Sequence, residues 1–424
     1  MQSGQDIEQR IAAIHDALEG VKVQLASYES AAKHFHGSDR LEDKANLTVA
    51  HNALVVDATR LLQTVRGPMD ALFEYSEKGA QAAAIRTLLA MGAFEKIPVD
   101  GTITATKLAE ALNVDKELLV RLMRAVTVVG PFKEVAEEEY AHTPFSEIFL
   151  SPHARGMFTL WTDNILLPWV KLPEFFATSG WKNPSQERNS PYTYGHQTGG
   201  KTVFEHMAQY PERVKALNLG MAAQSESSMW SVDIMDFRAL LSQYQTSDDS
   251  VLVVDIGGGK GHCLQRIHQL ISDVPGRLVL QDRPVVLAET DDLSDFRIEK
   301  CEYNFFEPQP IKGDLTVPRF LGAYIYYLRR VLHNWPDHIC VEILKNTAVA
   351  MEPGKSRIVI AEFVVPPVGA SMETASTDLV MMTMTGAQRT EKQWQQLLDA
   401  AGLKLEKTYT APGTDYGAVQ AVLK

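Results

Sequence analysis

Residues 251–267 read VLVVDIGGGKGHCLQRI, and this stretch decides the architecture of the C-terminal half of the chain. The β-branched run up to Asp255 predicts a buried strand, and the glycines after it predict a tight turn where backbone can approach a ligand closely. A helix should begin directly after the turn, as in strand–turn–helix units that hold cofactors. The spacing Gly257-x-Gly259-x-Gly261 differs from the pattern of dinucleotide folds and is followed by no P-loop signature, which disfavours NAD and FAD.

A second acidic residue supports a cofactor site at this place. The apolar run RLVLQD ends in Asp282, about twenty residues after the glycines. An acid at a neighbouring strand tip is placed to accept hydrogen bonds from ribose hydroxyls. Asp255 and Asp282 together suit a nucleoside with a cationic or zwitterionic tail.

The rest of the C-terminal half repeats short apolar runs, at 320–328 and 356–365, between helical stretches. This alternation predicts an α/β fold with a parallel, doubly wound sheet. We therefore expect a mostly helical domain over residues 1–210 and an α/β domain over 211–424. Within the helical domain, the aromatic-rich segment 151–194 suits either the wall of an apolar pocket or an ordinary core.

The N-terminal half carries apolar residues at helical spacing. They run through 5–66 and through an alanine-rich stretch around 73–89 that ends near Gly92, and both stretches predict helices. Residues 102–135 predict a helix–turn–helix with its turn at 113–115 and a chain break at Gly130-Pro131. Such a unit either reads DNA or serves packing and dimerisation. Its second helix carries the cations Lys116, Arg121 and Arg124.

Composition and charge restrict the partners. The chain is 45% hydrophobic and 22% charged, as in ordinary globular proteins. Its 41 basic and 53 acidic residues give a net charge of −12, which disfavours nucleic acid and anionic membranes as partners. No apolar stretch is long enough to span a bilayer, and we expect a cytoplasmic protein. The three scattered cysteines and the absence of histidine–carboxylate spacing predict no metal site.

The C-terminal three quarters of the chain also carry an ordered series of longer motifs. They are DIGGGKG at 255–261, LQDRPVV at 280–286, YNFFEPQP at 303–310, LRRVLHNWPD at 328–337, IAEFVVPP at 360–367 and GAQRTEKQW at 386–394. By these motifs the chain resembles the class I S-adenosylmethionine (SAM)-dependent O-methyltransferases of the plant caffeate and flavonoid type, particularly their fungal secondary-metabolism relatives. The resemblance implies a winged-helix-like N-terminal dimerisation domain, a Rossmann-like SAM-binding domain and a homodimer.

The same resemblance implies roles for residues at the cofactor site. The glycine loop, with Gly257, Gly259 and Gly261, would face the methionine part of SAM beside Asp255, and Asp282 would face the ribose. The cofactor set is completed by Asn304 and Phe305 at the adenine and by Arg329, where a basic residue approaches the cofactor.

His333 occupies the position of the family's general base, which removes a proton from the acceptor hydroxyl. An imidazole suits this task because its pKa lies near neutrality. Glu362 keeps one flanking acid of the family pattern, but Gln388 replaces the other, and Asn334 stands where the family usually has aspartate. An amide stabilises an imidazolium less than a carboxylate does, so these departures weaken proton abstraction.

Three functions therefore remain open. The first is O-methyl transfer to a hydroxyl of a small aromatic, enol or polyketide-like secondary metabolite. The second is that of the leporin-type pericyclases, which resemble the same family and use the sulfonium of SAM as a fixed charge without methyl transfer. The third is a cofactor-binding scaffold without catalysis.

Overall fold

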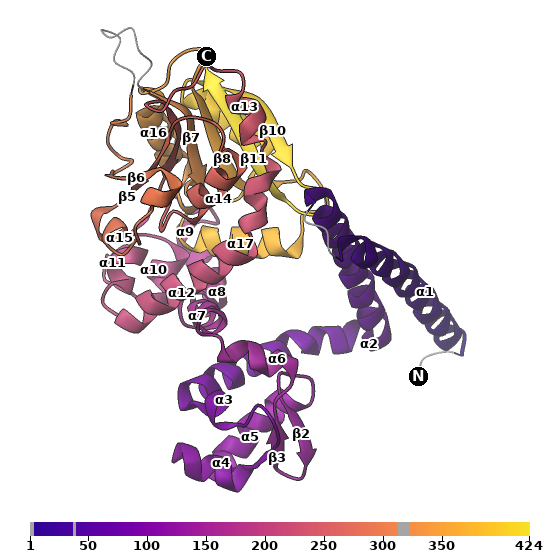
Figure 1. The fold of residues 1–424 in the computed structure, drawn as a ribbon. Helices are drawn as coiled ribbons and strands as arrows, with labels where there is room; N and C mark the ends of the chain where they lie inside the picture. The colour runs from indigo at the N-terminus through magenta and orange to yellow at the C-terminus, as the bar shows by residue number, and fades with distance from the viewer. Residues whose placement is uncertain (1–3, 37–39, 313–321) are drawn as a thin grey trace. The chain divides into compact units, whose positions relative to one another are not determined.

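The computed structural model describes residues 4–36, 40–312 and 322–424. They form two compact units, coloured along the chain in Figure 1. The first comprises Met1–Lys33, Ala50–Phe175 and Tyr192–Ser227, and the second comprises the remaining residues, chiefly Ser228–Lys424. The predicted division between residues 210 and 211 stays a prediction. No helix in the described ranges has the length and apolar character needed to cross a bilayer.

Two long helices open the first unit. Helix α1 (Gly4–Phe35) packs along α2 (Leu41–Met91), where Nη2 of Arg10 donates to the carbonyl of Val65 at 2.8 Å. The helices predicted within 5–66 are present as α1 and the first part of α2. The separate helix predicted around 73–89 is instead the continuation of α2, which kinks at Gly67, whose φ is 77°. Pro68 follows directly, and its missing N–H accounts for the break in the hydrogen-bond ladder.

A small α+β module follows α2 and confirms the helix–turn–helix. Asn113 ends its first helix with φ 54°, and Asp115 caps the second through the N–H of Leu118 at 2.8 Å. A three-stranded sheet forms the wing, and Leu108, Met123 and Phe132 fill the core between them. The elements are α3 (Ala93–Lys96), β1 (Ile103–Thr104), α4 (Ala105–Leu112), α5 (Lys116–Thr127), β2 (Lys133–Ala136) and β3 (Glu139–Ala141).

Short helices complete the first half of the chain. They are α6 (Pro144–Glu147), η1 (Ile148–Leu150), α7 (Pro152–Leu160), η2 (Trp161–Ile165), α8 (Leu166–Val170), α9 (Leu172–Ser179), α10 (Pro191–His196), α11 (Val203–Met207) and α12 (Pro211–Ser227). In the aromatic-rich segment, Phe175 is buried while Trp161 is 48% exposed. The segment therefore contributes to the core through some of its aromatic residues only.

The second unit contains the predicted doubly wound sheet. Its strand order is β10-β11-β8-β7-β4-β5-β6, with β9 beside β8. The strands from β8 to β6 are parallel, and β10 and β11 add an antiparallel edge. The strands are β4 (Val251–Ile256), β5 (Arg277–Asp282), β6 (Ile298–Glu302), β7 (Ala323–Arg329), β8 (Arg357–Val365), β9 (Arg389–Thr390), β10 (Leu403–Thr410) and β11 (Tyr416–Leu423). The start of the predicted run 320–328 lies outside the described residues.

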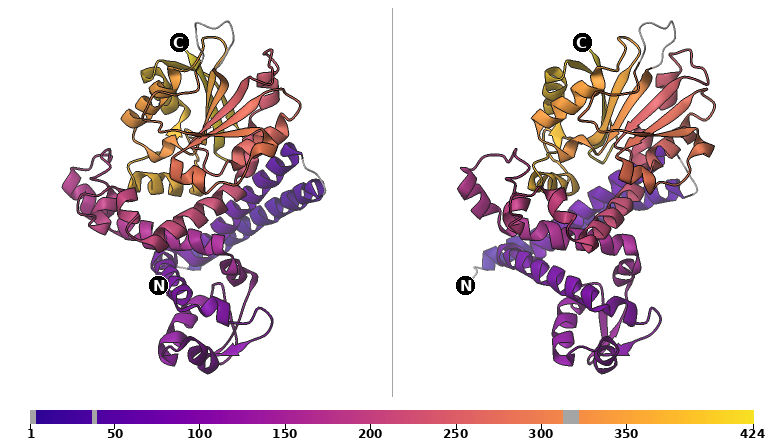
Figure 2. Two further views of the ribbon diagram at one scale, coloured as in Figure 1. Left: turned by 60° about the vertical axis from the view of Figure 1, so that its left-hand side comes forward. Right: turned by 90° about the vertical axis from the view of Figure 1, so that its left-hand side faces the viewer.

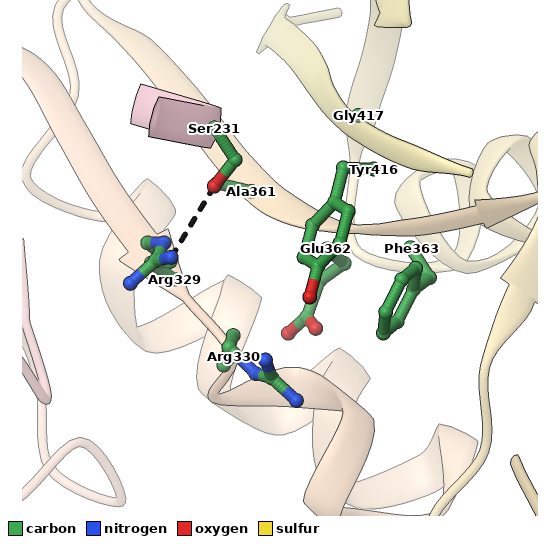
Figure 3. Close-up of a pocket in the computed structure, with 8 residues that line it drawn as sticks. All are labelled: Ser231, Arg329, Arg330, Ala361, Glu362, Phe363, Tyr416 and Gly417. Carbon is green, nitrogen blue, oxygen red and sulfur yellow. Dashed lines mark hydrogen bonds between the residues drawn. The ribbon is translucent and has the colours of Figure 1, made fainter. Parts of the chain in front are cut away.

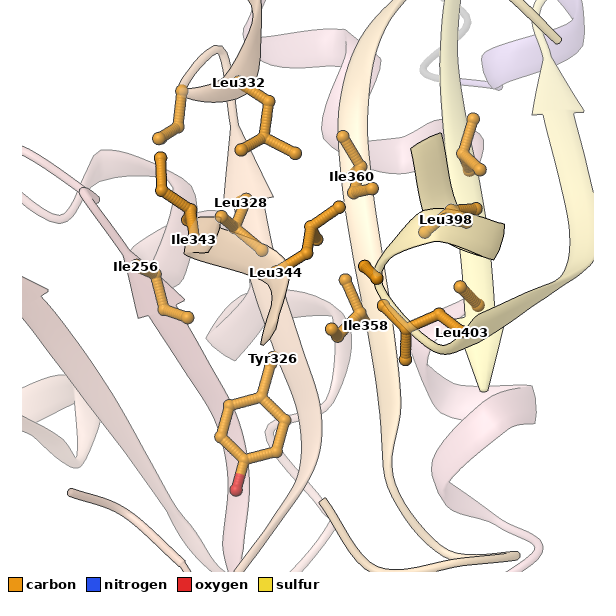
Figure 4. Close-up of a cluster of buried hydrophobic side chains, with 14 of the residues drawn as sticks. Ile256, Tyr326, Leu328, Leu332, Ile343, Leu344, Ile358, Ile360, Leu398 and Leu403 are labelled. Atoms are coloured by element: carbon orange, nitrogen blue, oxygen red, sulfur yellow. The ribbon is translucent and has the colours of Figure 1, made fainter. Parts of the chain in front are cut away.

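Helices cover both faces of this sheet, as the two views in Figure 2 show. One face packs against helices that contribute Phe237 and Leu264, and the other packs against helices that contribute Leu344 and Leu398. Figure 4 shows the second of these cores. The helices and 3₁₀ turns are η3 (Met229–Ile234), α13 (Phe237–Leu241), α14 (His262–Leu270), α15 (Pro284–Ala288), η4 (Ser294–Phe296), η5 (Leu332–Asn334), α16 (Asp337–Ala348), α17 (Met372–Thr383) and α18 (Glu391–Ala400).

The parallel strands all point their carboxyl ends to one edge of the sheet. Ligands of open α/β sheets bind outside this edge. At or near this edge lie Asp255 on β4, Asp282 on β5, Arg329 on β7 and Glu362 on β8, which follows the residue paired with Arg329. The topology thus brings together three acids and a cation that are spread over residues 255–362 of the sequence.

Candidate functional site

The glycine loop forms the predicted turn between β4 and α14. Gly257, Gly259 and Gly261 all have positive φ, at 71°, 60° and 79°, which residues with a Cβ rarely adopt. The N–H groups of Gly257 and Gly258 both donate to the carbonyl of Gln281, at 2.8 and 3.1 Å. A Cβ added to Gly259 would meet no atom within 4 Å, so this loop borders open space.

Asp255 lies beneath the glycine loop. A Cβ on Gly258 would come within 2.5 Å of Oδ2 of Asp255 and of Cδ1 of Leu280, so only glycine fits there. Oδ2 is buried and has no hydrogen-bond partner among the described residues. Burial raises the pKa of Asp255 to about 7, against the opposing effect of Arg329. A buried carboxyl oxygen without a donor is a place where a ligand's donor or a cationic group is stabilised.

Asp282 connects the loop to the next strand. Its Oδ2 accepts from the N–H of Gly259 at 2.9 Å, and its Oδ1 accepts from the N–H of Arg283 at 2.7 Å. Each carboxylate oxygen retains a lone pair for a further donor. Asp282 therefore both fixes the glycine loop and remains able to accept hydrogen bonds from a diol.

Asn304 and Phe305 follow β6 at the same edge. The N–H of Tyr303 donates to the carbonyl of Asp282 at 3.1 Å, which keeps them next to the end of β5. The ring of Phe305 lies 6.0 Å from that of Trp335, edge to face. The structure thus brings the predicted adenine residues near the acid predicted at the ribose.

Arg329 is held in place by several acceptors. Its Nη2 donates to the carbonyl of Ser228 at 2.9 Å and to the hydroxyls of Ser228 and Ser231 at 2.8 and 3.2 Å. Its Nη1 donates to Sγ of Cys263 at 3.4 Å. The guanidinium is therefore fixed between β7, η3 and α14, beside the glycine loop.

The three predicted catalytic residues meet in one buried cluster. His333 lies in η5 just after β7, Glu362 on β8, and Gln388 just before β9. The imidazole Nδ1 lies 3.0 Å from Nε2 of Gln388 and 3.3 Å from Oε2 of Glu362. The backbone N–H of His333 donates to Oε1 of Glu362 at 3.3 Å. All three side chains are buried.

The turn carrying His333 is fixed from two sides. The N–H of Ala387 donates to the carbonyl of His333 at 3.0 Å, and a Cβ on Gly386 would overlap that carbonyl oxygen. The side-chain amide of Asn334 donates to the carbonyls of Arg330 and Val331, at 3.1 and 3.3 Å. The Asn334 side chain therefore braces the backbone of this turn, where a carboxylate would face two acceptors.

Burial governs the charge of this cluster. It lowers the pKa of His333 well below its ordinary value, and the cations Arg330 and Arg389 lower it further. It raises the pKa of Glu362 to about 7, although Arg330 opposes this. The imidazole is therefore neutral at neutral pH and the contact with Glu362 is not an ion pair. A neutral imidazole is the form that accepts a proton.

The orientation of the Gln388 amide decides which imidazole nitrogen carries the proton. With Nε2 of Gln388 facing Nδ1, the amide donates to Nδ1 and leaves the proton on the other nitrogen, Nε2. Oε1 of Gln388 and Oε2 of Glu362 are both buried without a donor. A half-turn of the amide brings Oε1 to Nδ1, and a proton on Nδ1 then supplies both acceptors. The first arrangement makes Nε2, the nitrogen away from Gln388 and Glu362 (the outer nitrogen), a donor, and the second makes it a base.

The sequence reasoning missed Arg330. This residue follows β7 with a φ of 57°, and its Nε and Nη1 are buried without a hydrogen-bond partner among the described residues. It lines a pocket with Glu362, Phe363 and Tyr416, and Figure 3 shows these side chains converging on its guanidinium. The signal was present in the motif LRRVLHNWPD, where a second arginine adjoins the end of an apolar strand.

These features fit a sulfonium nucleoside. A bend of positive-φ glycines leaves room for close backbone approach, Asp282 can accept from a diol, and Asp255 presents a buried oxygen without a donor. In the described ranges, no group of three or more histidine, cysteine or acidic residues could hold a metal ion. The sheet order and this site define a class I SAM-dependent methyltransferase.

Comparison with known proteins identifies the family. Sequence profiles of an O-methyltransferase dimerisation domain and an O-methyltransferase domain match residues 73–152 and 182–404. The O-methyltransferase kntB of Aspergillus niger is 42% identical over 393 residues, which cover 92% of this chain and 93% of kntB. The chain belongs to the class I O-methyltransferase family, and its cofactor is SAM.

Solved structures agree with this assignment. OxaC in complex with S-adenosylhomocysteine (SAH) and oxaline is 36% identical, with a TM-score of 0.79, and the match covers 96% of this chain and 100% of OxaC. A pericyclic reaction enzyme is 25% identical with a TM-score of 0.76, over 95% of this chain and 100% of that enzyme. The resemblance seen in the sequence motifs is thus confirmed, including its two branches.

Proposed function

We propose that this protein transfers a methyl group from SAM to a hydroxyl of a small aromatic, enol or polyketide-like metabolite, with His333 as the general base. The observation that carries the proposal is the cluster around Nδ1 of His333. Two buried acceptors, Oε1 of Gln388 and Oε2 of Glu362, lack a donor that a proton on Nδ1 would supply. In this tautomer the outer nitrogen is unprotonated and can take the proton of an acceptor hydroxyl.

The chain's own residues have distinct tasks in this proposal. When bound, SAM supplies an electrophilic methyl group on a positively charged sulfur. Asp282 and the glycine loop hold the nucleoside, with Asn304 and Phe305 at the adenine and Arg329 beside the loop. Glu362 and Gln388 orient the His333 ring and keep its tautomer, and burial excludes water from the proton transfer.

Mass spectrometry with methyl-deuterated SAM tests the reaction. Label in the product, and SAH formed in equal amount, would support methyl transfer. His333→Ala should lower turnover by about 100- to 10,000-fold while SAH binding persists. Turnover without label or SAH would reject the proposal, and cofactor binding without any turnover would favour the non-catalytic scaffold.

A second candidate is a SAM-dependent pericyclic reaction. It is favoured by the likeness to a pericyclic reaction enzyme and by the amide orientation in which Gln388 donates to Nδ1. The outer nitrogen of His333 would then donate a hydrogen bond to a substrate carbonyl. The product would keep the mass of its substrate or lose water, and SAM would remain intact.

We further propose a homodimer and a small-molecule substrate. The dimerisation-domain match supports the dimer, as do the exposed apolar side chains on α1 and α2. Among them, Val56, Met69, Leu72 and Phe73 are each more than half exposed. Light scattering that gave the mass of one chain, 47.1 kDa, at micromolar concentration would contradict the dimer.

A further inference from the structure

The pocket beside Glu362 is lined by a cation, Arg330, that lies over the ring of Phe363. Nε and Nη1 of Arg330 are buried and donate no hydrogen bond to any of the described residues. Neither polar neighbour in the pocket forms a hydrogen bond with it. Oε1 of Glu362 accepts from the backbone of His333, Oε2 of Glu362 has no donor, and the hydroxyl of Tyr416 donates to Glu373 at 3.0 Å. Buried guanidinium donors are normally hydrogen-bonded. Two such nitrogens without an acceptor, on a side chain that lines a pocket, therefore indicate that an oxygen of a ligand binds there.

The position of Arg330 places this acceptor away from the glycine loop. The strand order is β8-β7-β4, and the loop follows β4. The guanidinium of Arg330 instead lies among side chains from β8 and β11, with its Cζ 5.8 Å from the ring centroid of Phe363. Glu362, which lines the same pocket, is 3.3 Å from the imidazole of His333. The pocket therefore adjoins the base, and Arg329 and Ser231 line its other side.

We propose that Arg330 binds a carbonyl or enolate oxygen of the acceptor, conjugated to the hydroxyl that His333 deprotonates. A guanidinium offers a planar pair of donors that suits such an oxygen. The role of His333 rests on the proposed methyl transfer, whereas the oxygen site itself does not.

The chemistry of the base requires such a partner. His333 is a weak base in its buried setting, so the hydroxyl must be acidic, as in a phenol or enol conjugated to a carbonyl. When the proton passes to His333, the negative charge spreads to the carbonyl oxygen beside Arg330, and methylation of the hydroxyl oxygen removes that charge. The cation stabilises the charge as it develops, in a site from which water is excluded.

Paired probes test the oxygen site without turnover. 1-Hydroxyanthraquinone has a carbonyl next to its hydroxyl, and 1-anthrol lacks it. We would measure the binding of each to the full SAH-loaded chain by tryptophan fluorescence. The parent should bind the carbonyl probe about tenfold more tightly or better. Arg330→Met should abolish this preference, and Arg330→Lys should keep part of it because the charge remains.

Two controls complete the experiment. Calorimetric binding of SAH reports folding of each variant, and Arg330→Gln replaces Arg330→Met if the latter does not fold. Arg277→Gln removes an arginine from the opposite edge of the sheet, where it pairs with Glu299, and should leave the probe preference unchanged.

Several results would overturn the proposal. They are a parent that binds neither probe or both equally, an Arg330→Met variant that keeps the preference, and a loss of SAH affinity that equals the loss for the probe. The last result would place the cofactor carboxylate at Arg330. A preference that depends on Arg330 without any labelled product would uphold the oxygen site while rejecting methyl transfer.

Discussion

Replacing Gln388 by glutamate should convert His333 into a stronger base. The amide nitrogen of Gln388 lies 3.0 Å from Nδ1 of His333, and a glutamate of the same length would place a carboxylate oxygen there. A carboxylate only accepts hydrogen bonds, so Nδ1 would carry the proton and the outer nitrogen would be the base. The substitution also stabilises the imidazolium by opposite charge.

The size of the effect follows from this distance. At 3.0 Å and an effective dielectric constant of about 20, the attraction between the two charges is about 5 kcal/mol. Part of it is lost to burial of the new carboxylate and to repulsion from Glu362. An adjacent opposite charge typically moves a pKa by about one to three units, or about 1.4 to 4 kcal/mol. The pKa of His333 should therefore rise by that amount in Gln388→Glu.

The assay is nitrogen NMR of the histidine rings, which needs no substrate. The chain has 12 histidines, and loss of one ring signal in His333→Gln identifies His333. The chemical shifts of the two ring nitrogens report both the tautomer and the pKa. Gln395→Glu adds the same charge at an exposed position on α18 and should leave the His333 signals unchanged.

The raised pKa of His333 in Gln388→Glu also predicts how turnover depends on pH. A base works in its neutral form, so a higher pKa moves the acid limb of turnover to higher pH. Above that limb, turnover rises if proton abstraction limits the rate. A pKa of His333 that stays well below its ordinary value in Gln388→Glu, or an unchanged tautomer, would refute the electrostatic reasoning.

Three further substitutions test other parts of the site. Asp282→Ala removes an acceptor for the cofactor and also the acceptor of the Gly259 N–H. The affinity for SAH, measured by calorimetry, should fall about 10- to 100-fold. Asp291 is exposed, and Asp291→Ala should leave the affinity for SAH unchanged. Asn334→Asp sets a carboxylate against two carbonyls, and denaturant unfolding should show a loss of about 1 to 3 kcal/mol; equal stability would argue against the bracing role. Glu362 has a folded pKa of about 7, above its ordinary value of 4.5, so the folded chain binds this proton more tightly than the unfolded chain, and its contribution to stability falls as pH rises from 4.5 to about 7. Glu362→Gln should remove that loss, up to about 3 kcal/mol at pH 8, and an unchanged pH slope of unfolding would contradict it.

The central strands could be predicted from the sequence because they are buried on both faces. Strand β4 is buried at every residue and therefore reads as a continuous apolar run. Strands β6 and β10 have exposed residues along their lengths and mix charged with apolar side chains, which left no run to recognise. The interruption at Gly67 falls between the stretches predicted over 5–66 and 73–89, but the periodicity does not show that a single helix, α2, continues across it.

At the site, too, some features could be predicted from the sequence and others could not. The positions of His333, Glu362 and Gln388 were predicted through family motifs, and the fold brings them within hydrogen-bond distance or slightly beyond it. Neither the amide orientation of Gln388 nor the unpaired donors of Arg330 can be inferred from sequence, because both depend on what surrounds the side chain. Burial also reverses a simple expectation, since an acid beside a histidine here leaves its pKa lowered and not raised.

The contacts of Arg329 affect how this enzyme can be recombined with its relatives. Its guanidinium is held by the backbone and hydroxyl of Ser228, the residue at which the chain enters its second unit after α12, and by Ser231. A chimera that exchanges N-terminal halves between two family members should therefore be spliced before Ser228. If the chains are joined after η3, the residues at positions 228 and 231 come from the other parent, while Arg329 comes from this chain. Chimeras joined there should bind the cofactor less well, whatever change in acceptor specificity the exchange was meant to produce.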